Sequence, residues 1–123
     1  MNEMGEYLDT QLKTLTPNVW HEEIPQSVDE DVSVVYKFPN SVTLEAREDF
    51  LVEVDVWCKG VNAVPAITLA NQISVLLDNK KLFINNQAFR FRKLAQREIP
   101  EPEDLLFRRQ VEFSCKIVRG KTV

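Results

Sequence analysis

The alternation of apolar and other side chains in residues 49–59 is the feature that most constrains how this chain folds. Apolar side chains occupy every second position of this segment, at Phe50, Val52, Val54, Val56 and Cys58. A period of two is that of a β-strand with one buried face. Residues 32–38 and 106–118 show the same period, the latter through Val111, Phe113, Cys115 and Ile117. The chain must therefore build a sheet whose one face lies in the core.

Two other segments have helical periodicity. Residues 2–14 place apolar side chains near every fourth position, and Thr16-Pro17 ends this helix because the residue before proline is pushed out of the helical region. Residues 62–78 form the second predicted helix, with Asn62 as its N-cap and Pro65 in its first turn. Its outward side is neutral at Thr68, Asn71, Gln72 and Ser74, where a solvated helix usually carries Lys and Glu. We expect another surface to cover that side.

The remaining segments complete an α+β pattern. Residues 19–24 predict a short strand, residues 82–84 and 88–92 predict a hairpin around Asn85-Asn86-Gln87, and Pro100 and Pro102 interrupt the sheet. This order predicts one domain over residues 1–123, with a mostly antiparallel or mixed β-sheet and two main helices packed on one face. Its N-terminal residues, a connection at residues 39–48 and a tail at residues 119–123 are expected to be flexible.

Charge is divided unevenly along the chain. The formal net charge is −4, but residues 1–58 hold 13 acidic and 3 basic residues, while residues 59–123 hold 6 acidic and 12 basic residues. The acidic balance of the whole argues against general nucleic-acid binding, which needs a surplus of cations. The asymmetry favours association through complementary charges, unless the two halves interleave in space and their fields cancel.

Residues that could support catalysis are sparse. His21 stands beside Glu22 and Glu23, but adjacent strand residues point to opposite faces and the HExxH spacing is absent. The three glycines, at positions 5, 60 and 120, cannot form a phosphate-binding loop, and two Cys with one His cannot complete a four-ligand zinc site. The sequence therefore predicts no catalytic, metal-binding or cofactor-binding residues. An enzyme stays the alternative, and it would require His21 or a Cys to gather partners in space.

Cys58 and Cys115 both fall on predicted inward faces of strands. The pattern favours two small buried thiols, and a disulfide between them is the alternative.

The sequence shows no targeting or membrane segment. Glu3, Glu6 and Asp9 stand where a signal peptide would need a basic start and an apolar run. The uncharged residues 60–77 contain too many polar side chains for a membrane-spanning helix. We expect a protein that is cytoplasmic when made and has no contact with a membrane.

Several segments together resemble a known family. They are residues 19–25 (VWHEEIP), the paired strands at 32–38 and 50–57, the helix at 63–77, and residues 105–113 (LLFRRQVEF). In these segments and in the order of its elements, nearly the whole chain resembles the small tail-completion and tail-terminator proteins of long-tailed bacteriophages and prophages.

This resemblance implies a non-enzymatic structural subunit that forms a ring, typically a hexamer in that family, and caps the completed tail tube. The implied partners are other copies of the chain, the tail tube protein and the head connector protein. The implied location is the head-proximal end of the tail in the virion, and the host bacterial cytoplasm during assembly. Whether the isolated chain is a monomer, and whether it acts as terminator or head-side adaptor, stays open.

A ring requires an interface between two different patches of the same molecule. The charge division predicts an acidic patch at Glu45, Glu48, Glu53 and Asp55 that docks on a basic patch at Arg90, Arg92, Arg97, Arg108 and Arg109.

The alternative function is a small nucleic-acid-binding domain that uses Arg90, Arg92, Arg108 and Arg109. Against it, the strand period turns the aromatic rings of residues 89 and 91 to the face opposite the arginines, where rings and cations cannot cooperate. We therefore expect no nucleic-acid partner.

Overall fold

The computed structural model describes residues 3–21, 32–38, 49–59, 63–84, 87–100 and 106–117. The elements follow one another as α1 (Glu3–Leu12), β1 (Val19–His21), β2 (Val32–Lys37), β3 (Asp49–Lys59), α2 (Val64–Leu77), β4 (Lys81–Ile84), β5 (Gln87–Ile99) and β6 (Leu106–Ile117). The predicted α+β class is confirmed. The predicted flexible segments at residues 39–48 and 119–123 lie outside the described residues, as do residues 1 and 2.

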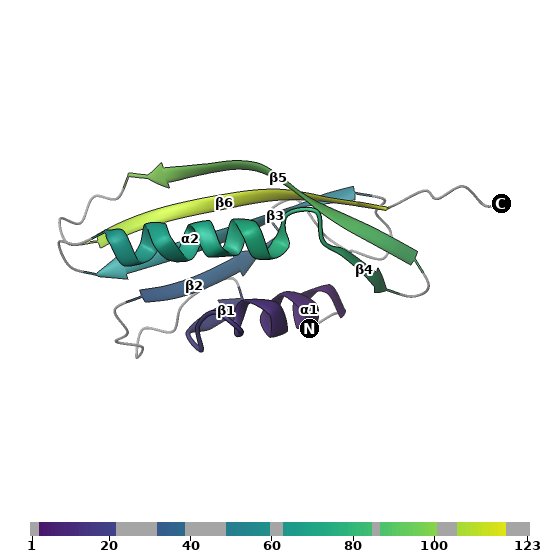
Figure 1. The fold of residues 1–123 in the computed structure, drawn as a ribbon, viewed down its shortest axis with the longest axis horizontal. Coiled ribbons are helices and arrows are strands. Elements are labelled where there is room, and N and C mark those ends of the chain that lie inside the picture. The colour runs from purple at the N-terminus through teal and green to yellow at the C-terminus, as the bar shows by residue number, and fades with distance from the viewer. Residues whose placement is uncertain are drawn as a thin grey trace.

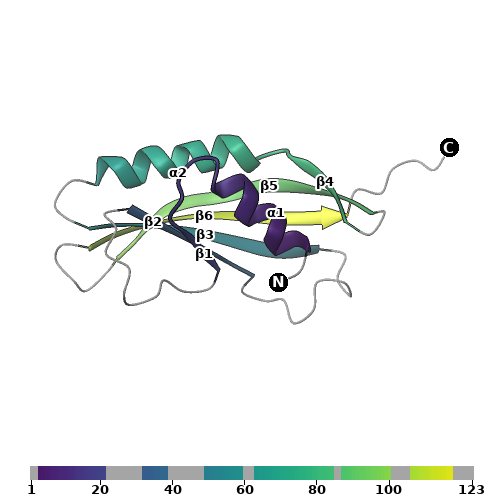
Figure 2. The same ribbon diagram turned by 90° about the horizontal axis from the view of Figure 1, so that it is seen from below.

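The strands form one six-stranded sheet in the order β1-β2-β3-β6-β5-β4. β1 runs parallel to β2, and every other neighbouring pair is antiparallel, so the sheet is mixed. The sheet curls, with α2 lying along β3, β5 and β6 (Figure 1). Seen from below, α2 lies on one side of the strands and α1 passes in front of them (Figure 2).

The core lies between the sheet and the two helices. Val52 and Val54 of β3 stand opposite Phe113 and Val111 of β6, and all four side chains are fully buried. Residues of both helices belong to the same apolar cluster, which confirms that the helices cover one face of the sheet. Burial of alternate positions is what the period of two predicts.

α1 is held to the sheet by apolar packing and by a hydrogen bond between Tyr36 and Gly5. Leu8 and Leu12 are fully buried, and the ring of Tyr7 stacks on Phe91 of β5 with 5.9 Å between centroids. The hydroxyl of the buried Tyr36 in β2 donates a hydrogen bond of 3.1 Å to the carbonyl of Gly5. Burial, with a smaller contribution from the negative charge of Asp9, raises the pKa of Tyr36 to about 12.

The start of α2 differs from the prediction. The N-cap position is Ala63, whose side chain makes no capping hydrogen bond, where the sequence suggested Asn62. Pro65 lies in the first turn as predicted, where its missing N–H leaves no hydrogen bond unmade. At the other end, Asn79 has a positive φ of 64° and its N–H donates to the carbonyl of Phe91. The carboxylate of Asp78 accepts from the N–H of Lys93, so the end of α2 is tied to β5.

β5 is longer than predicted. The predicted hairpin ended at residue 92, but the strand continues to Ile99, with a β-bulge between Lys93 and Ala95. In this part of the strand, polar side chains on the helix side interrupt the alternation of apolar residues from which a strand is predicted. Gln96 points to α2, where its amide donates to Asn71 and accepts from Ser74. A partly buried polar group that is hydrogen-bonded in this way can take the place of an apolar one.

Both cysteines are buried thiols that are not joined in a disulfide, in agreement with the favoured interpretation. Burial raises the pKa of the Cys115 thiol to about 12. Within the described residues, neither helix has the length and apolar character that crossing a membrane would require.

Candidate subunit interface

The sheet face that points away from the helices carries a network of polar side chains centred on Asp55. Asp55 in β3 stands opposite Gln110 in β6 and is only 2% exposed. Its two carboxylate oxygens accept hydrogen bonds from Gln110 at 3.0 Å and from the guanidinium of Arg108 at 2.9 Å. A buried carboxylate requires such partners, because an unpaired charge away from water is strongly unfavourable.

The network extends to the neighbouring strands. Arg97 in β5 donates to the side-chain carbonyl of Gln110 at 3.0 Å and lies 3.8 Å from the carboxylate of Glu112. In β2, the ammonium of Lys37 lies 3.5 Å from Glu53 and 3.9 Å from Asp55. These contacts link four strands, β2, β3, β6 and β5, across one face of the sheet.

An aromatic ring shares this face. The guanidinium of Arg108 lies over the ring of Trp57, 5.0 Å from its centroid, as expected from the pairing of the two residues across β3 and β6. Sequence reasoning did not single out Trp57. Its place in the alternation of β3, on the same side as Glu53 and Asp55, could have indicated this residue. Its contact with Arg108 depends in addition on the register of β3 against β6, which the sequence alone does not give.

The structure places the predicted interface residues in three groups. Glu53, Asp55, Arg97 and Arg108 contact one another or their neighbours within the chain, so their charges are matched without a second copy. Arg90 and Arg92 lie on the same face of the sheet, in β5.

Arg109 lies on the other face. It stands opposite Val56, whose side chain is in the core, so it is separated from the remaining arginines. Glu45 and Glu48 lie outside the described residues. The predicted contact between an acidic and a basic patch stays a prediction, but Asp55 and Arg108 have each other as partners.

The placement also bears on the nucleic-acid alternative. Phe89 and Phe91 are buried in the core, as the strand period predicts, and so cannot stack on bases. Arg90, Arg92 and Arg108 share one face of the sheet and Arg109 does not. The four arginines therefore do not form one basic surface.

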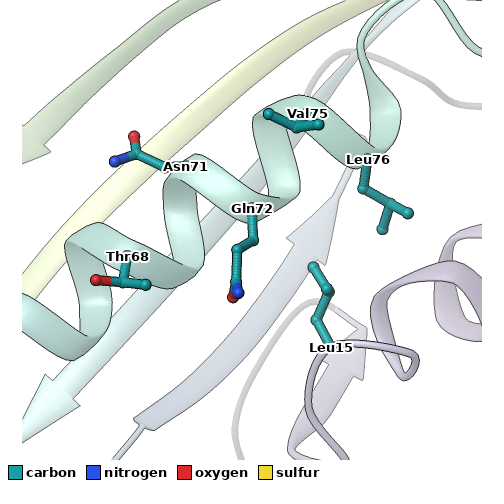
Figure 3. A pocket seen from close by; sticks show the side chains of 6 residues that line it. All are labelled: Leu15, Thr68, Asn71, Gln72, Val75 and Leu76. Carbon is teal, nitrogen blue, oxygen red and sulfur yellow. The ribbon is translucent and has the colours of Figure 1, made fainter.

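The outward side of α2 is a second candidate surface. Val64 and Val75 are 61% and 81% exposed, and α2 contains no charged residue. An open groove of about 520 Å³ runs beside this side, lined by Leu15, Thr68, Asn71, Gln72, Val75 and Leu76. In Figure 3, Gln72 and Leu76 of α2 lie opposite Leu15, which follows α1. The groove offers apolar surface and neutral hydrogen-bonding groups.

The third candidate surface is the β4 edge of the sheet. Phe83 of β4 is 76% exposed, and the neighbouring Lys80 and Lys81 are exposed as well. Arg92 and Lys93 of the adjacent strand β5 are also exposed. Sequence reasoning assigned Phe83 to a strand without noting its side of the sheet. Leu82 beside it is buried, and alternation therefore leaves Phe83 on the outer side.

His21 is packed on aromatic rings. Its imidazole stacks on Tyr36 with 4.8 Å between centroids and makes an edge contact with Phe38. Glu22 and Glu23 lie outside the described residues. Among the residues that the structure does describe, no three His, Cys, Asp or Glu side chains gather where they could hold a metal ion.

Comparison with known proteins yields a likeness in fold. No family model and no curated protein matches this sequence. A solved structure superposes on the chain with a TM-score of 0.68, covering 95% of this chain and 92% of that chain at 13% sequence identity. At this identity the likeness concerns the arrangement of helices and strands, and the two chains share that fold.

Proposed function

We propose that the protein is a structural subunit of a phage or prophage tail that forms a ring, completes or terminates the tail tube and joins it to the head connector. The observation that carries this proposal is the uncharged outward side of α2, with Val64 and Val75 exposed. The resemblance of the sequence to tail-completion and tail-terminator proteins supplies the tail tube and the connector as partners.

An uncharged exposed helix side favours an assembly role for a physical reason. The buried centre of a protein interface is depleted of charged residues, because each charge would lose its water on association. Burying an exposed valine side chain contributes about 1.5 kcal/mol or somewhat more. A side of a helix that presents Val64, Val75 and neutral amides is therefore more stable when a neighbouring subunit covers it.

The exposed Phe83 supports the same function. It lies on β4, whereas the groove lies beside α2, so the molecule offers two different apolar patches. Different patches on one molecule allow the head-to-tail contact from which a closed ring is built.

Electron microscopy tests the proposal. The purified protein is mixed with phage tails that lack this subunit, and we expect a ring of added density at the head-proximal end of the tail tube. Val75→Lys places a charge on the uncharged side of α2 and should abolish that density. Thr10→Lys places the same charge on an exposed position of α1 and should leave the density unchanged. Wild-type protein that adds no density, or a Val75→Lys variant that assembles normally, contradicts the proposal.

One observation favours the nucleic-acid alternative. Lys80, Lys81, Arg92 and Lys93 are all exposed, and residues 80–97 contain no acidic residue. A nucleic-acid-binding protein would bind labelled DNA or RNA with an affinity that falls steeply with salt. In that case Arg92→Glu would weaken binding to all sequences, and a fluorescence anisotropy titration at two salt concentrations separates the two functions.

A further inference from the structure

A cluster of cations lies on the face of the sheet that points away from the helices, at its β4–β5–β6 end. Lys81 of β4 stands opposite Arg90 of β5, which stands opposite Lys116 of β6, so three cations form one row across three strands. Arg92 follows on the same face, two positions along β5. The residues that alternate with these four are buried in the core: Leu82, Phe89, Phe91 and Cys115.

The sheet gains no stability from this row, because like charges that stand directly opposite each other on neighbouring strands are destabilising. Within the described residues, Lys81, Arg90, Arg92 and Lys116 form no ion pair. Other cations of the same face are matched by carboxylates: Lys37 by Glu53, Arg97 by Glu112, and Arg108 by Asp55. The four unmatched cations, which we call the outer-face basic cluster, therefore suit negative charge from outside the chain.

The nearby helix α1 does not supply that negative charge. It packs on the opposite face of the sheet, where Tyr7 stacks on Phe91. Its Asp9 is paired with Lys13, and within the described residues its exposed Glu6 forms no ion pair with the cluster.

An exposed aromatic ring adjoins the cluster. Phe83 follows Lys81 by two positions in β4, lies on the same face and is 76% exposed. In protein interfaces a few aromatic and arginine side chains supply most of the binding energy, and the residues around them exclude water. Phe83 and the cluster around it have this composition.

We propose that the outer-face basic cluster binds an acidic surface of a different protein, with Phe83 as the apolar anchor of the contact. The inference rests on the proposed function and specifies the chemistry of one partner, which presents several carboxylates beside an apolar recess. It assigns Phe83 to a contact with that partner rather than with another copy of the chain.

The described part of this chain offers no acidic patch that would make a second copy the partner. Its exposed acidic residues stand on three different parts of the fold: Glu6 in α1, Asp78 after α2 and Glu98 in β5. Four other carboxylates are paired within the chain: Asp9, Glu53, Asp55 and Glu112. The complement of the cluster is therefore expected on another protein.

The borders of the cluster favour a compact acidic patch over a nucleic acid. Along β6 on this face, Lys116 is followed by Ser114 and then by Glu112, and across the strands Asp49 of β3 stands opposite Lys116. A nucleic-acid strand carries a negative charge at every nucleotide, so a strand that continued past the cluster in these directions would meet acidic residues. A protein patch can match the cluster and end where the cluster ends.

Peptide binding tests the proposal on the full chain. The probe is a fluorescein-labelled oligoglutamate with one central leucine, and its anisotropy is measured at ionic strengths of about 0.01 M and about 1 M. We expect binding at low salt that is lost at high salt. Lys81→Gln and Arg92→Gln should each weaken it about threefold, as removal of one exposed ion pair does. Phe83→Ala should weaken it about fivefold.

Arg97→Gln is the matched control, because it removes an exposed cation from the same face whose charge Glu112 already matches. It should leave the affinity for the peptide unchanged. An equal loss in Arg97→Gln and Arg92→Gln, or no binding by the wild type at low salt, would overturn the inference.

Two further outcomes would name another occupant and overturn the inference as well. A labelled oligothymidylate with the same number of charges that binds more tightly than the peptide would make the cluster a nucleic-acid site. In sedimentation velocity at low salt, a loss of self-association in Arg92→Gln would show that the cluster contacts a second copy.

Failure of the inference and failure of the proposed function are distinguishable. Peptide binding that depends on the cluster, together with no density on tails, retains the acidic partner and removes the tail function. Density on tails that Lys81→Gln and Arg92→Gln leave unchanged, without peptide binding, retains the tail function and removes this contact.

Discussion

Asp55 shows how a single residue can be misplaced when only its sequence neighbours are known. Its position in an alternating strand identifies the face on which it lies, and its charge suggests an exposed site. The structure buries it between Arg108 and Gln110, which follow it by 53 and 55 positions. A contact over that separation depends on the register of β3 against β6, which composition and periodicity do not determine.

Replacing Asp55 should destabilise the protein strongly. Asp55→Ala leaves the guanidinium of Arg108, whose side chain is 19% exposed, without its carboxylate, and breaking a buried pair in this way typically costs about 3 kcal/mol. The free energy of unfolding from urea denaturation measures the loss. Glu112→Ala removes a more exposed and longer ion pair to Arg97 and should cost at most about 1 kcal/mol. Equal losses in the two variants would mean that the network contributes no more than a surface pair.

The stability of the protein should fall in alkaline solution. The pKa values of Tyr36 and Cys115 are both raised to about 12 by burial, so both groups stay protonated in the folded chain. In the unfolded chain a thiol ionises near pH 8.5 and a phenol near pH 10. The unfolded state therefore holds fewer protons between about pH 9 and pH 12, and the free energy of unfolding decreases as the pH rises through that range.

Tyr36→Phe isolates the contribution of the phenol. This variant loses the hydrogen bond to Gly5 and should be less stable than the wild type at pH 7 by about 1 kcal/mol. Above about pH 10 its free energy of unfolding should decrease less steeply than that of the wild type, because no phenol remains at this position to ionise. Urea denaturation at a series of pH values provides the comparison. Parallel curves for the two proteins would show that burial does not hold the Tyr36 hydroxyl in its protonated form.

At the scale of elements, the sequence predicts the helices and strands in which apolar side chains recur with one period from end to end. Both helices and β3 are of this kind, because one face of each packs into the same core. In β6 the apolar period begins only at Val111, because Arg109 stands on the core-facing side opposite Val56. The second half of β5 lacks such a period, because Gln96 takes the place of an apolar residue on the helix side and forms hydrogen bonds with Asn71 and Ser74. The groove beside α2 was anticipated only as an uncharged helix side, because its other wall, Leu15, comes from a connection that has no periodicity.

α1 contributes to stability mainly through its buried leucines. Leu8→Ala should lower the free energy of unfolding by about 3 kcal/mol, because Leu8 is fully buried against the sheet and its truncation leaves a cavity. Thr10→Ala, on the exposed side of the same helix, should change stability by less than about 0.5 kcal/mol. Urea or thermal denaturation measures both. A small effect of Leu8→Ala would show that α1 is not required for the folded core.

At the scale of the whole molecule, charge is divided along the chain. Residues 80–97, which contain β4 and most of β5, hold six cations and no acid, and residues 1–31, of which the structure describes 3–21, hold eight acids and one cation. Pairing of these segments between copies would be electrostatically favourable at low salt and screened at high salt. Arg97 contributes less to this than the other five cations, because it is paired with Glu112 within the chain.

Assembly should accordingly depend on concentration and on salt. In sedimentation velocity, we expect the proportion of oligomers to rise with protein concentration. It should fall as ionic strength increases from about 0.01 M to about 1 M, where the screening length shortens from about 30 Å to about 3 Å. A chain that sediments as a monomer at every concentration in low salt would show that a ring forms only on a template such as the tail tube.

The bulge in β5 makes the length of that strand critical. Arg90 and Arg97 are separated by an odd number of positions, yet both lie on the sheet face away from the helices, opposite Lys116 and Gln110 of β6. Leu94, the additional residue between Lys93 and Ala95, shifts the alternation by one and makes this possible. Deleting Leu94 would therefore remove the bulge and leave Phe91 and Arg97 on their present faces. Inserting one further residue after Leu94 should be far more harmful, because it shifts the alternation again and turns either Phe91 outward or Arg97 inward.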